Sequence, residues 1–298
     1  MASPELESVL DLLHGNPVPR PESVEEWRAT VDAQLSAPLV DGTTEQAAIL
    51  GDRPAALIRP AAFVPDRTVL FLHGGAYEVG SIAAYRGFTS ELALRLEAVM
   101  AVLDYRLAPE HPFPAAVEDA VAAYRDLLAQ GTQPERMVIM GDSAGGGLAI
   151  ATLIALARED LPAPAAAVSL SPWTDMTLTA DAYTRCSESD RFLDREMLSR
   201  SVESYLGAAD PRDPLASPVF ASEAELGALP PLLVQAAAGE VLADDAATLA
   251  ENVRAAGGEV ELELWPEMTH VWQLLGPTVP EARDAVDRIS QFVRSRCA

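Results

Sequence analysis

The sequence predicts an α/β fold in which a mostly parallel sheet is covered by helices on both faces. Two observations predict it. Short β-type runs alternate with helical stretches along most of the chain. The pentapeptide Gly141-Asp142-Ser143-Ala144-Gly145 then follows one of these runs and leads into a helix of small residues. A Gly-x-Ser-x-Gly at a strand-to-helix turn is typical of a nucleophile elbow, which exposes the serine hydroxyl at the sheet edge. The sequence therefore predicts covalent acyl transfer by Ser143.

The remaining elements follow from periodicity. Residues 1–40 are expected to form two amphipathic helices, because their apolar residues recur at helical spacing. Residues 175–220 are rich in charged and turn residues around a helix at 195–205. We expect a single domain spanning 1–298, with a cap built from about residues 1–40 and 175–220. Strands are expected at 55–58, 68–72, 99–105, 137–140, 166–170, 232–236 and 260–264.

Composition excludes several classes of function. The formal net charge of −24 offers no basic face, so no nucleic-acid partner is expected. The chain contains no Lys, which excludes Schiff-base and Ser-Lys catalysis. Its two cysteines, Cys186 and Cys297, indicate neither a disulfide framework nor a metal site. Without a signal-peptide pattern or a membrane-length apolar run, we expect a cytoplasmic protein with no membrane partner and a small-molecule substrate.

The general base is expected to be His270. On an elbow of this kind the catalytic partners follow the serine in the order acid, then histidine. Of the four histidines, only His270 lies after Ser143. It comes just beyond the last expected strand, in a loop that could carry the imidazole to the serine hydroxyl.

The acid must lie between these two residues, and Glu240 is the best-placed candidate. It follows the strand expected at 232–236 by a short turn, at the end of the sheet where active-site loops emerge. Asp244 and Asp245 lie about one helical turn further on. They are expected at the N-terminus of a helix beginning at Ala246, where carboxylates favour the free N–H groups. Asp244 remains open as an alternative acid.

An oxyanion hole is expected from a glycine-rich loop near the other end of the chain. His73-Gly74-Gly75-Ala76 follows the strand expected at 68–72. The backbone N–H groups of Gly75 and Ala76 would join that of Ala144 around a developing oxyanion. Gly74 would supply the turn, and His73 is expected to fix the loop by a hydrogen bond.

Aromatic residues beside these motifs are candidates for the substrate pocket. Tyr77, Trp173 and Trp272 adjoin the motif loops, and with Gly74 they form the expected substrate-binding set. Core packing is the alternative role for each aromatic. No metal site is expected. Further aromatic candidates come from the cap, at Tyr183, Phe192 and Tyr205.

With these motifs together, the chain resembles the bacterial hormone-sensitive-lipase-like esterases, which are α/β-hydrolases. The resemblance implies an eight-stranded α/β-hydrolase sheet, an N-terminal helical cap, no cofactor and carboxylesterase activity on short acyl chains. It also implies structural roles for the Asp104-Tyr105-Arg106 run, Glu110 and Asp142. The matching pieces span residues 70–275: His73–Ala76, Asp104–Ala116, Gly141–Gly146, Ser171–Trp173, Glu240–Asp245 and the loop ending at His270.

Two positions depart from the family pattern. Ala76 stands where the family commonly has a third glycine, but only a backbone N–H is used there. Glu240 stands where most members have Asp. A subset that resembles small-molecule esterases and lactone hydrolases carries Glu, which adds small lactones to the candidate substrates.

Other functions remain open on this scaffold. An amidase or deacetylase would use the same three residues. A non-catalytic small-molecule receptor is a third class, although such proteins usually lack a working histidine. A homodimer through an exposed apolar edge or the C-terminal helix is also open.

Overall fold

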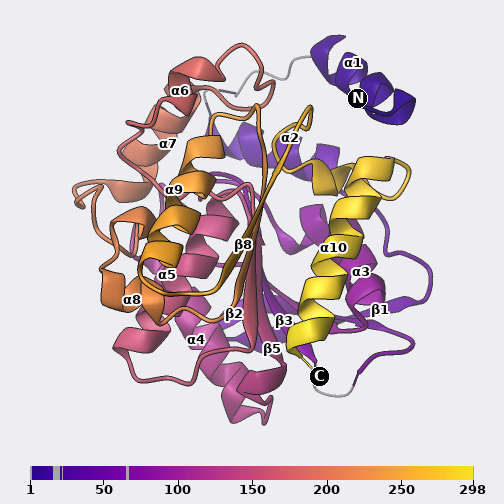
Figure 1. Ribbon diagram of the computed structural model, residues 1–298. Helices are drawn as coiled ribbons and strands as arrows, with labels where there is room; N and C mark the ends of the chain where they lie inside the picture. The colour runs from indigo at the N-terminus through magenta and orange to yellow at the C-terminus, as the bar shows by residue number, and fades with distance from the viewer. Residues whose placement is uncertain (1, 16–20, 22, 65–66, 298) are drawn as a thin grey trace.

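A computed structural model describes residues 2–15, 21, 23–64 and 67–297 and centres on an eight-stranded sheet (Figure 1). The strand order is β1-β2-β4-β3-β5-β6-β7-β8. β1 and β2 are antiparallel to their neighbours, and all other neighbouring strands are parallel. The strands are β1 (Thr43–Leu50), β2 (Arg53–Pro60), β3 (Thr68–Leu72), β4 (Val99–Leu103), β5 (Met137–Asp142), β6 (Ala166–Leu170), β7 (Leu232–Ala237) and β8 (Val260–Trp265). The expected α/β-hydrolase sheet is confirmed.

Strand β1 has no counterpart among the seven strands expected from sequence pattern. It lies at the sheet edge and pairs only with β2, so most of its residues remain partly or fully exposed. Leu50 is its one buried residue. An edge strand of this kind needs no alternation of apolar and polar residues, and its sequence carries no such signal.

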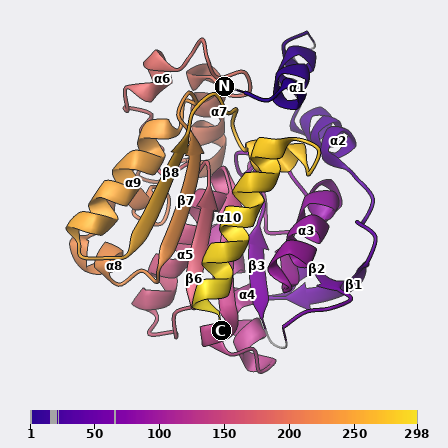
Figure 2. The same cartoon turned by 45° about the vertical axis from the view of Figure 1, so that its right-hand side comes forward.

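Helices cover both faces of the sheet (Figure 2). α3 and α10 pack on one face, while α4, α5 and α9 pack on the other. The helices are α1 (Pro4–Gly15), α2 (Val24–Leu35), α3 (Ile82–Leu96), α4 (Ala115–Ala129), α5 (Ala144–Arg158), α6 (Ala182–Arg185), α7 (Arg195–Leu206), α8 (Glu223–Gly227), α9 (Ala243–Ala255) and α10 (Pro280–Arg296), with 3-10 turns at Pro134–Arg136, Pro218–Phe220 and Trp272–Leu275. Within the described part of the chain, every helix is too short or too polar to cross a lipid bilayer.

Helix α5 is the central helix of the fold. Its first thirteen residues are all buried, which is expected for a helix that is apolar on every side. Small residues at its start let it approach the sheet and the following loop closely. A Cβ on Gly147 would lie 2.0 Å from the carbonyl oxygen of Trp173. The start of α5, where the expected nucleophile lies, is therefore held rigidly.

The expected cap segments lie near the ends of the parallel strands, where α1, α2, α6 and α7 gather (Figures 1 and 2). Residues 16–20 and 22 of the first segment lie outside the described residues. Helix α2 is tied down by Arg28, whose guanidinium donates to both carboxylate oxygens of Glu110 and to the carbonyl oxygens of Glu78 and Ala108. This confirms the structural role expected for Glu110.

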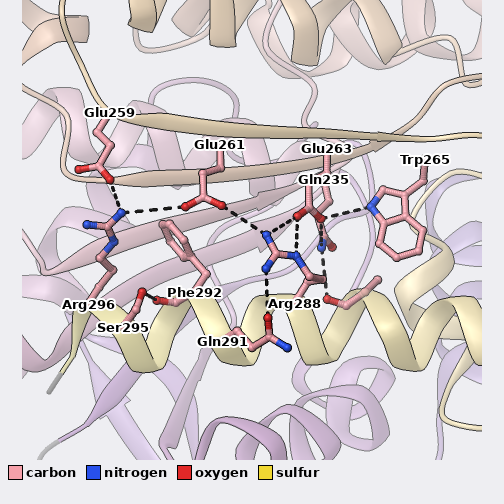
Figure 3. A network of polar contacts seen from close by, with 11 residues as sticks. Gln235, Glu259, Glu261, Glu263, Trp265, Arg288, Gln291, Phe292, Ser295 and Arg296 are labelled. Carbon is pink, nitrogen blue, oxygen red and sulfur yellow. Dashed lines mark hydrogen bonds and ion pairs between the residues drawn. The ribbon is translucent and has the colours of Figure 1, made fainter.

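Polar contacts also link α10 to the edge strand β8 (Figure 3). Arg288 lies 2.8 Å from a Glu263 carboxylate oxygen and 3.4 Å from one of Glu261, and Arg296 pairs with Glu259. Ion pairs that are this exposed contribute about 1 kcal/mol or less each. The helix is therefore held mainly by the apolar side chains Ile289, Phe292 and Val293, which are buried against the sheet.

Candidate active site

Ser143 sits in a strained turn between β5 and α5. Its backbone has φ +54° and ψ −123°, a region that residues other than glycine rarely occupy. The turn is fixed by its own main chain, because the Ser143 N–H donates to the Leu170 carbonyl at 2.7 Å and its carbonyl accepts from the Trp173 N–H at 3.0 Å. A Cβ on Gly145 would lie 2.0 Å from the Leu72 carbonyl oxygen, so the turn requires glycine there.

The structure brings Ser143, His270 and Glu240 together in one line. The Nε2 atom of His270 lies 3.0 Å from the Ser143 hydroxyl, and its Nδ1 lies 2.7 Å from a Glu240 carboxylate oxygen. The other Glu240 oxygen accepts the Ala237 N–H at 3.1 Å. Since a carboxylate only accepts, Nδ1 carries the proton and Nε2 is left to accept from the serine.

The groups around His270 raise the pKa of its imidazole. Burial by itself lowers the pKa of His270, but the hydrogen bond and charge of Glu240, followed by the charges of Asp190 and Asp142, outweigh it. The pKa of His270 consequently lies above its ordinary value. Burial raises the pKa of Glu240, against the opposing hydrogen bond and charge of His270.

Asp244 and Asp245 have a different task from Glu240. Helix α9 begins at Ala243 rather than Ala246, so both lie in its first turn, but their carboxylates bond to the cap segment instead of capping α9. Asp245 accepts the N–H groups of Thr174 and Asp175, both at 2.9 Å. Asp244 accepts the N–H of Ala182 and pairs with Arg185. The carboxylate in contact with His270 is thus that of Glu240.

The expected oxyanion loop lies beside the elbow because β3 and β5 are neighbours, with Leu72 opposite Gly141. Gly75, Ala76 and Tyr77 all have positive φ, at +114°, +54° and +63°. The turn closes through the Gly75 carbonyl, which accepts the N–H groups of Glu78 and Val79. Positive φ at Ala76 is a physical reason for glycine to be common at this place.

Two buried side chains fix this loop, as expected. Asp142 accepts the Gly74 N–H at 2.9 Å and the Tyr85 hydroxyl at 2.8 Å. Burial raises the pKa of Asp142 to about 6. His73 lies with Nδ1 2.8 Å from the Gly74 carbonyl and stacks on Tyr105, whose hydroxyl donates to the His73 carbonyl. Sequence analysis did not identify the contribution of Tyr85.

The rest of the Asp104-Tyr105-Arg106 run is structural too. Asp104 accepts the N–H of Ile82 at the start of α3. Arg106 pairs with the buried carboxylate of Asp119 at 2.8 Å. The run therefore connects β4 to two helices beside the loop, and it contributes no group to the line of three residues.

The aromatic residues expected around the pocket separate into two groups. Tyr77 and Trp173 are fully buried with Tyr205, which stacks on Tyr77 with ring centroids 3.8 Å apart. Trp272 instead lies in a separate apolar cluster with Leu6 and donates its indole N–H to the Glu281 carbonyl. The structure thus places Tyr77 and Trp173 in one core cluster and Trp272 in another, so all three have the alternative role of core packing.

Tyr183 and Phe192, the other cap aromatics, also differ from each other. The Tyr183 hydroxyl donates to Asp245 at 3.1 Å, and the side chain is buried. Phe192 is 41% exposed.

Residues without a sequence-predicted role support the His270 loop. The hydroxyl oxygen of Ser171, which directly follows β6, accepts the Val271 N–H at 3.2 Å. Gln273 donates to Gln235 on β7 at 3.0 Å. Ser171 was visible only as part of a family motif, and the two glutamines carried no signal, because their partners are distant in sequence.

The site holds no assembled metal centre within the described residues, where no three histidine, cysteine or carboxylate side chains gather to hold an ion. What the arrangement provides is a hydroxyl, an imidazole and a carboxylate in hydrogen-bond contact. This geometry, on a sheet with this strand order, defines the serine hydrolases of the α/β-hydrolase class.

Comparison with known proteins agrees with this class. The family model described as alpha/beta hydrolase fold matches residues 69–274. An acetyl-hydrolase of Streptomyces hygroscopicus is 44% identical over 301 residues, covering 99% of this chain and 98% of its own. The solved structure of an esterase from the bacterial hormone-sensitive lipase family is 41% identical, covers 100% of both chains and has a TM-score of 0.95.

A second solved structure is EstE5 soaked with p-nitrophenyl butyrate, which is 38% identical, covers 99% of both chains and also has a TM-score of 0.95. The chain belongs to the α/β-hydrolase family, and within it to the hormone-sensitive-lipase-like esterases. It is a serine hydrolase that acts on carboxylic esters.

Proposed function

We propose that the protein hydrolyses short-chain acyl esters and small lactones through an acyl-enzyme on Ser143, with His270 as general base and Glu240 as the triad acid. The observation that carries the proposal is the continuous contact from the Ser143 hydroxyl through the imidazole to the Glu240 carboxylate. An acceptor nitrogen at hydrogen-bond distance is what a serine hydroxyl requires to become a nucleophile near neutral pH.

The reaction begins when Ser143 Oγ attacks the ester carbonyl while its proton moves to Nε2 of His270. Glu240 stabilises the imidazolium that forms. The N–H groups of Gly75, Ala76 and Ala144 receive the oxyanion, and each such donor contributes on the order of a hundred- to a thousandfold in rate. His270 then protonates the departing alcohol, which leaves the acyl group on Ser143.

Deacylation repeats these steps with water. His270 accepts a proton from the water, whose oxygen attacks the acyl carbonyl, and the same proton returns to Ser143 as the carboxylic acid leaves. With a lactone, the alcohol and the acid are parts of one product molecule, and the protein groups act identically.

The packing beside the nucleophile supports a short acyl group. Ser143 is 9% exposed, and Tyr77, Trp173 and Tyr205 are packed together in the core that also contains Ala144. Because the interior of a protein is close-packed, a long acyl chain would have to displace these side chains. The similar structure soaked with p-nitrophenyl butyrate points to acyl groups of the same small size.

The test is steady-state hydrolysis of nitrophenyl esters from acetate to dodecanoate, followed by small lactones, with Ser143→Ala as the matched variant. We expect turnover of the shortest esters by the wild type and loss of this turnover in the variant. An equal rate in Ser143→Ala would contradict the nucleophile assignment. If the wild type is inert on every ester and lactone, amide substrates and ligand binding become the functions to examine.

A further inference from the structure

A loop of the expected cap, at Ser189 and Asp190, hydrogen-bonds the backbone on both sides of Glu240. The hydroxyl of Ser189 donates to the carbonyl of Gly239 at 2.7 Å, and the carboxylate of Asp190 accepts the N–H of Val241 at 2.9 Å. These are the two residues adjacent to Glu240 in the chain.

The loop is itself organised to present these two side chains. The N–H groups of Ser189 and Asp190 both donate to the carbonyl of Cys186, at 3.1 and 2.9 Å. The second oxygen of Asp190 accepts the N–H groups of Phe192 and Leu193, each at 3.0 Å. A carboxylate that accepts three N–H groups is held in a single orientation, so its bond to Val241 is preorganised.

The exposed fractions of Glu240, Ser189 and Asp190 show on which side of the acid the loop lies. Glu240 is 1% exposed, whereas Ser189 is exposed and Asp190 is only partly buried. The loop therefore closes over the acid from the solvent side.

We propose that Ser189 and Asp190 are positioning residues, which hold Glu240 in line with His270 and make the geometry of the triad depend on the docking of the cap. This inference rests on the proposed Ser143-His270-Glu240 triad. Small displacements of a catalytic group have large effects, since a 1 Å error in position costs about a hundredfold in rate.

Asp190 also acts through its charge. Three carboxylates act electrostatically on His270, namely Glu240 from the turn after β7, Asp190 from the cap and Asp142 from the end of β5. Each favours the imidazolium and raises the pKa of His270. Removing the charge of Asp190 therefore moves the pKa of His270 downward, which a purely structural residue would not do.

The experiment compares Ser189→Ala and Asp190→Asn with matched controls from the same segment. Ser187→Ala removes a hydroxyl that donates to the Thr184 carbonyl of the preceding helix α6 and, within the described part of the chain, makes no bond to the Glu240 turn. Asp194→Asn removes one charge and keeps an oxygen that can accept the helix-cap bond from the Met197 N–H. In Ser189→Ala and Asp190→Asn we expect kcat to fall roughly tenfold, with KM changed less than about twofold. Both controls should match the wild type.

The second readout does not need turnover. Imidazole nitrogen titration by NMR, with the His270 signals identified by their loss in His270→Gln, should show a lower midpoint for His270 in Asp190→Asn and an unchanged midpoint in Asp194→Asn. The acid limb of kcat/KM should shift in the same direction. If Asp190→Asn has the same kcat and the same His270 titration midpoint as Asp194→Asn, the inference is overturned. If Ser143→Ala is still inactive in that case, the proposed function stands without it.

Discussion

The two halves of the site are held in different ways. The Ser143 half is fixed by main-chain hydrogen bonds and by close glycine contacts between its strand-turn-helix unit and the ends of the neighbouring strands β3 and β6. The half with Glu240 and His270 stands on two loops after β7 and β8, which are held by contacts with side chains from distant segments, such as Ser171 with Val271 and Gln235 with Gln273. The Ser143 half is therefore rigid, because its geometry is built into the packing of the sheet and helix α5. The Glu240–His270 half is adjustable, because it depends on side-chain contacts between loops. Substitutions in the rigid half should lower stability, and substitutions in the adjustable half should lower activity.

The largest expected effect is a loss of stability from a substitution in the rigid half. Gly145→Ala places a Cβ 2.0 Å from the Leu72 carbonyl oxygen, and the strand and helix cannot separate without opening the core. We expect a loss of about 3 kcal/mol or more in the free energy of unfolding, measured by urea denaturation. Gly131→Ala is the control, because it has positive φ but no atom within 4 Å of its Cβ. It should lose only about 1–2 kcal/mol, and equal losses would contradict the steric explanation.

The next effect separates the two candidate acids of the adjustable half. Glu240→Gln should lower kcat on the order of 10⁴-fold while the fold is retained, because an amide does not hold the Nδ1–H tautomer of His270. Asp244→Asn weakens an exposed pair with Arg185 and should cost less than about tenfold. Kinetics on a short nitrophenyl ester check both, and the reverse order of losses would assign the acid to Asp244.

A smaller effect follows from protonation. His270 must be neutral to accept the serine proton, and its pKa is raised above the ordinary value of 6.5 by Glu240, Asp190 and Asp142. A raised pKa means that the imidazole takes up its proton at higher pH. We expect kcat/KM to be constant at high pH and to fall about tenfold per pH unit below a midpoint above 6.5. A profile that stays flat through this range would exclude His270 as the base.

The smallest effect concerns the support of the His270 loop. Gln273→Ala removes the bond to Gln235 at 3.0 Å, one of several contacts that hold the loop. We expect kcat to fall less than about tenfold, with an unfolding free energy lower by about 1 kcal/mol. Gln291→Ala is the matched control, because this exposed residue of α10 contacts Arg288 (Figure 3) and lies outside the site. A loss as large as that of Glu240→Gln would mean that the loop has no redundant support.

The same comparison explains what sequence could predict. The elbow is encoded in consecutive residues, so Ser143, Ala144 and the strand before them followed from a local pattern. His270 and Glu240 were found by chain order, because their contacts span 127 and 30 residues. The supports Ser171, Ser189 and Asp190 have no local signature, since each bonds to backbone far away in the chain. Strand β1 escaped prediction because an exposed edge leaves no apolar alternation.

The central claim is that Ser143 is the nucleophile that His270 activates. Labelling with a phosphonate ester, followed by intact mass and peptide mapping, tests this most directly. The account predicts a single adduct on the peptide containing Ser143, loss of esterase activity in proportion to labelling, and much slower labelling in His270→Ala. An adduct on another serine, or full activity after complete labelling of Ser143, would contradict it.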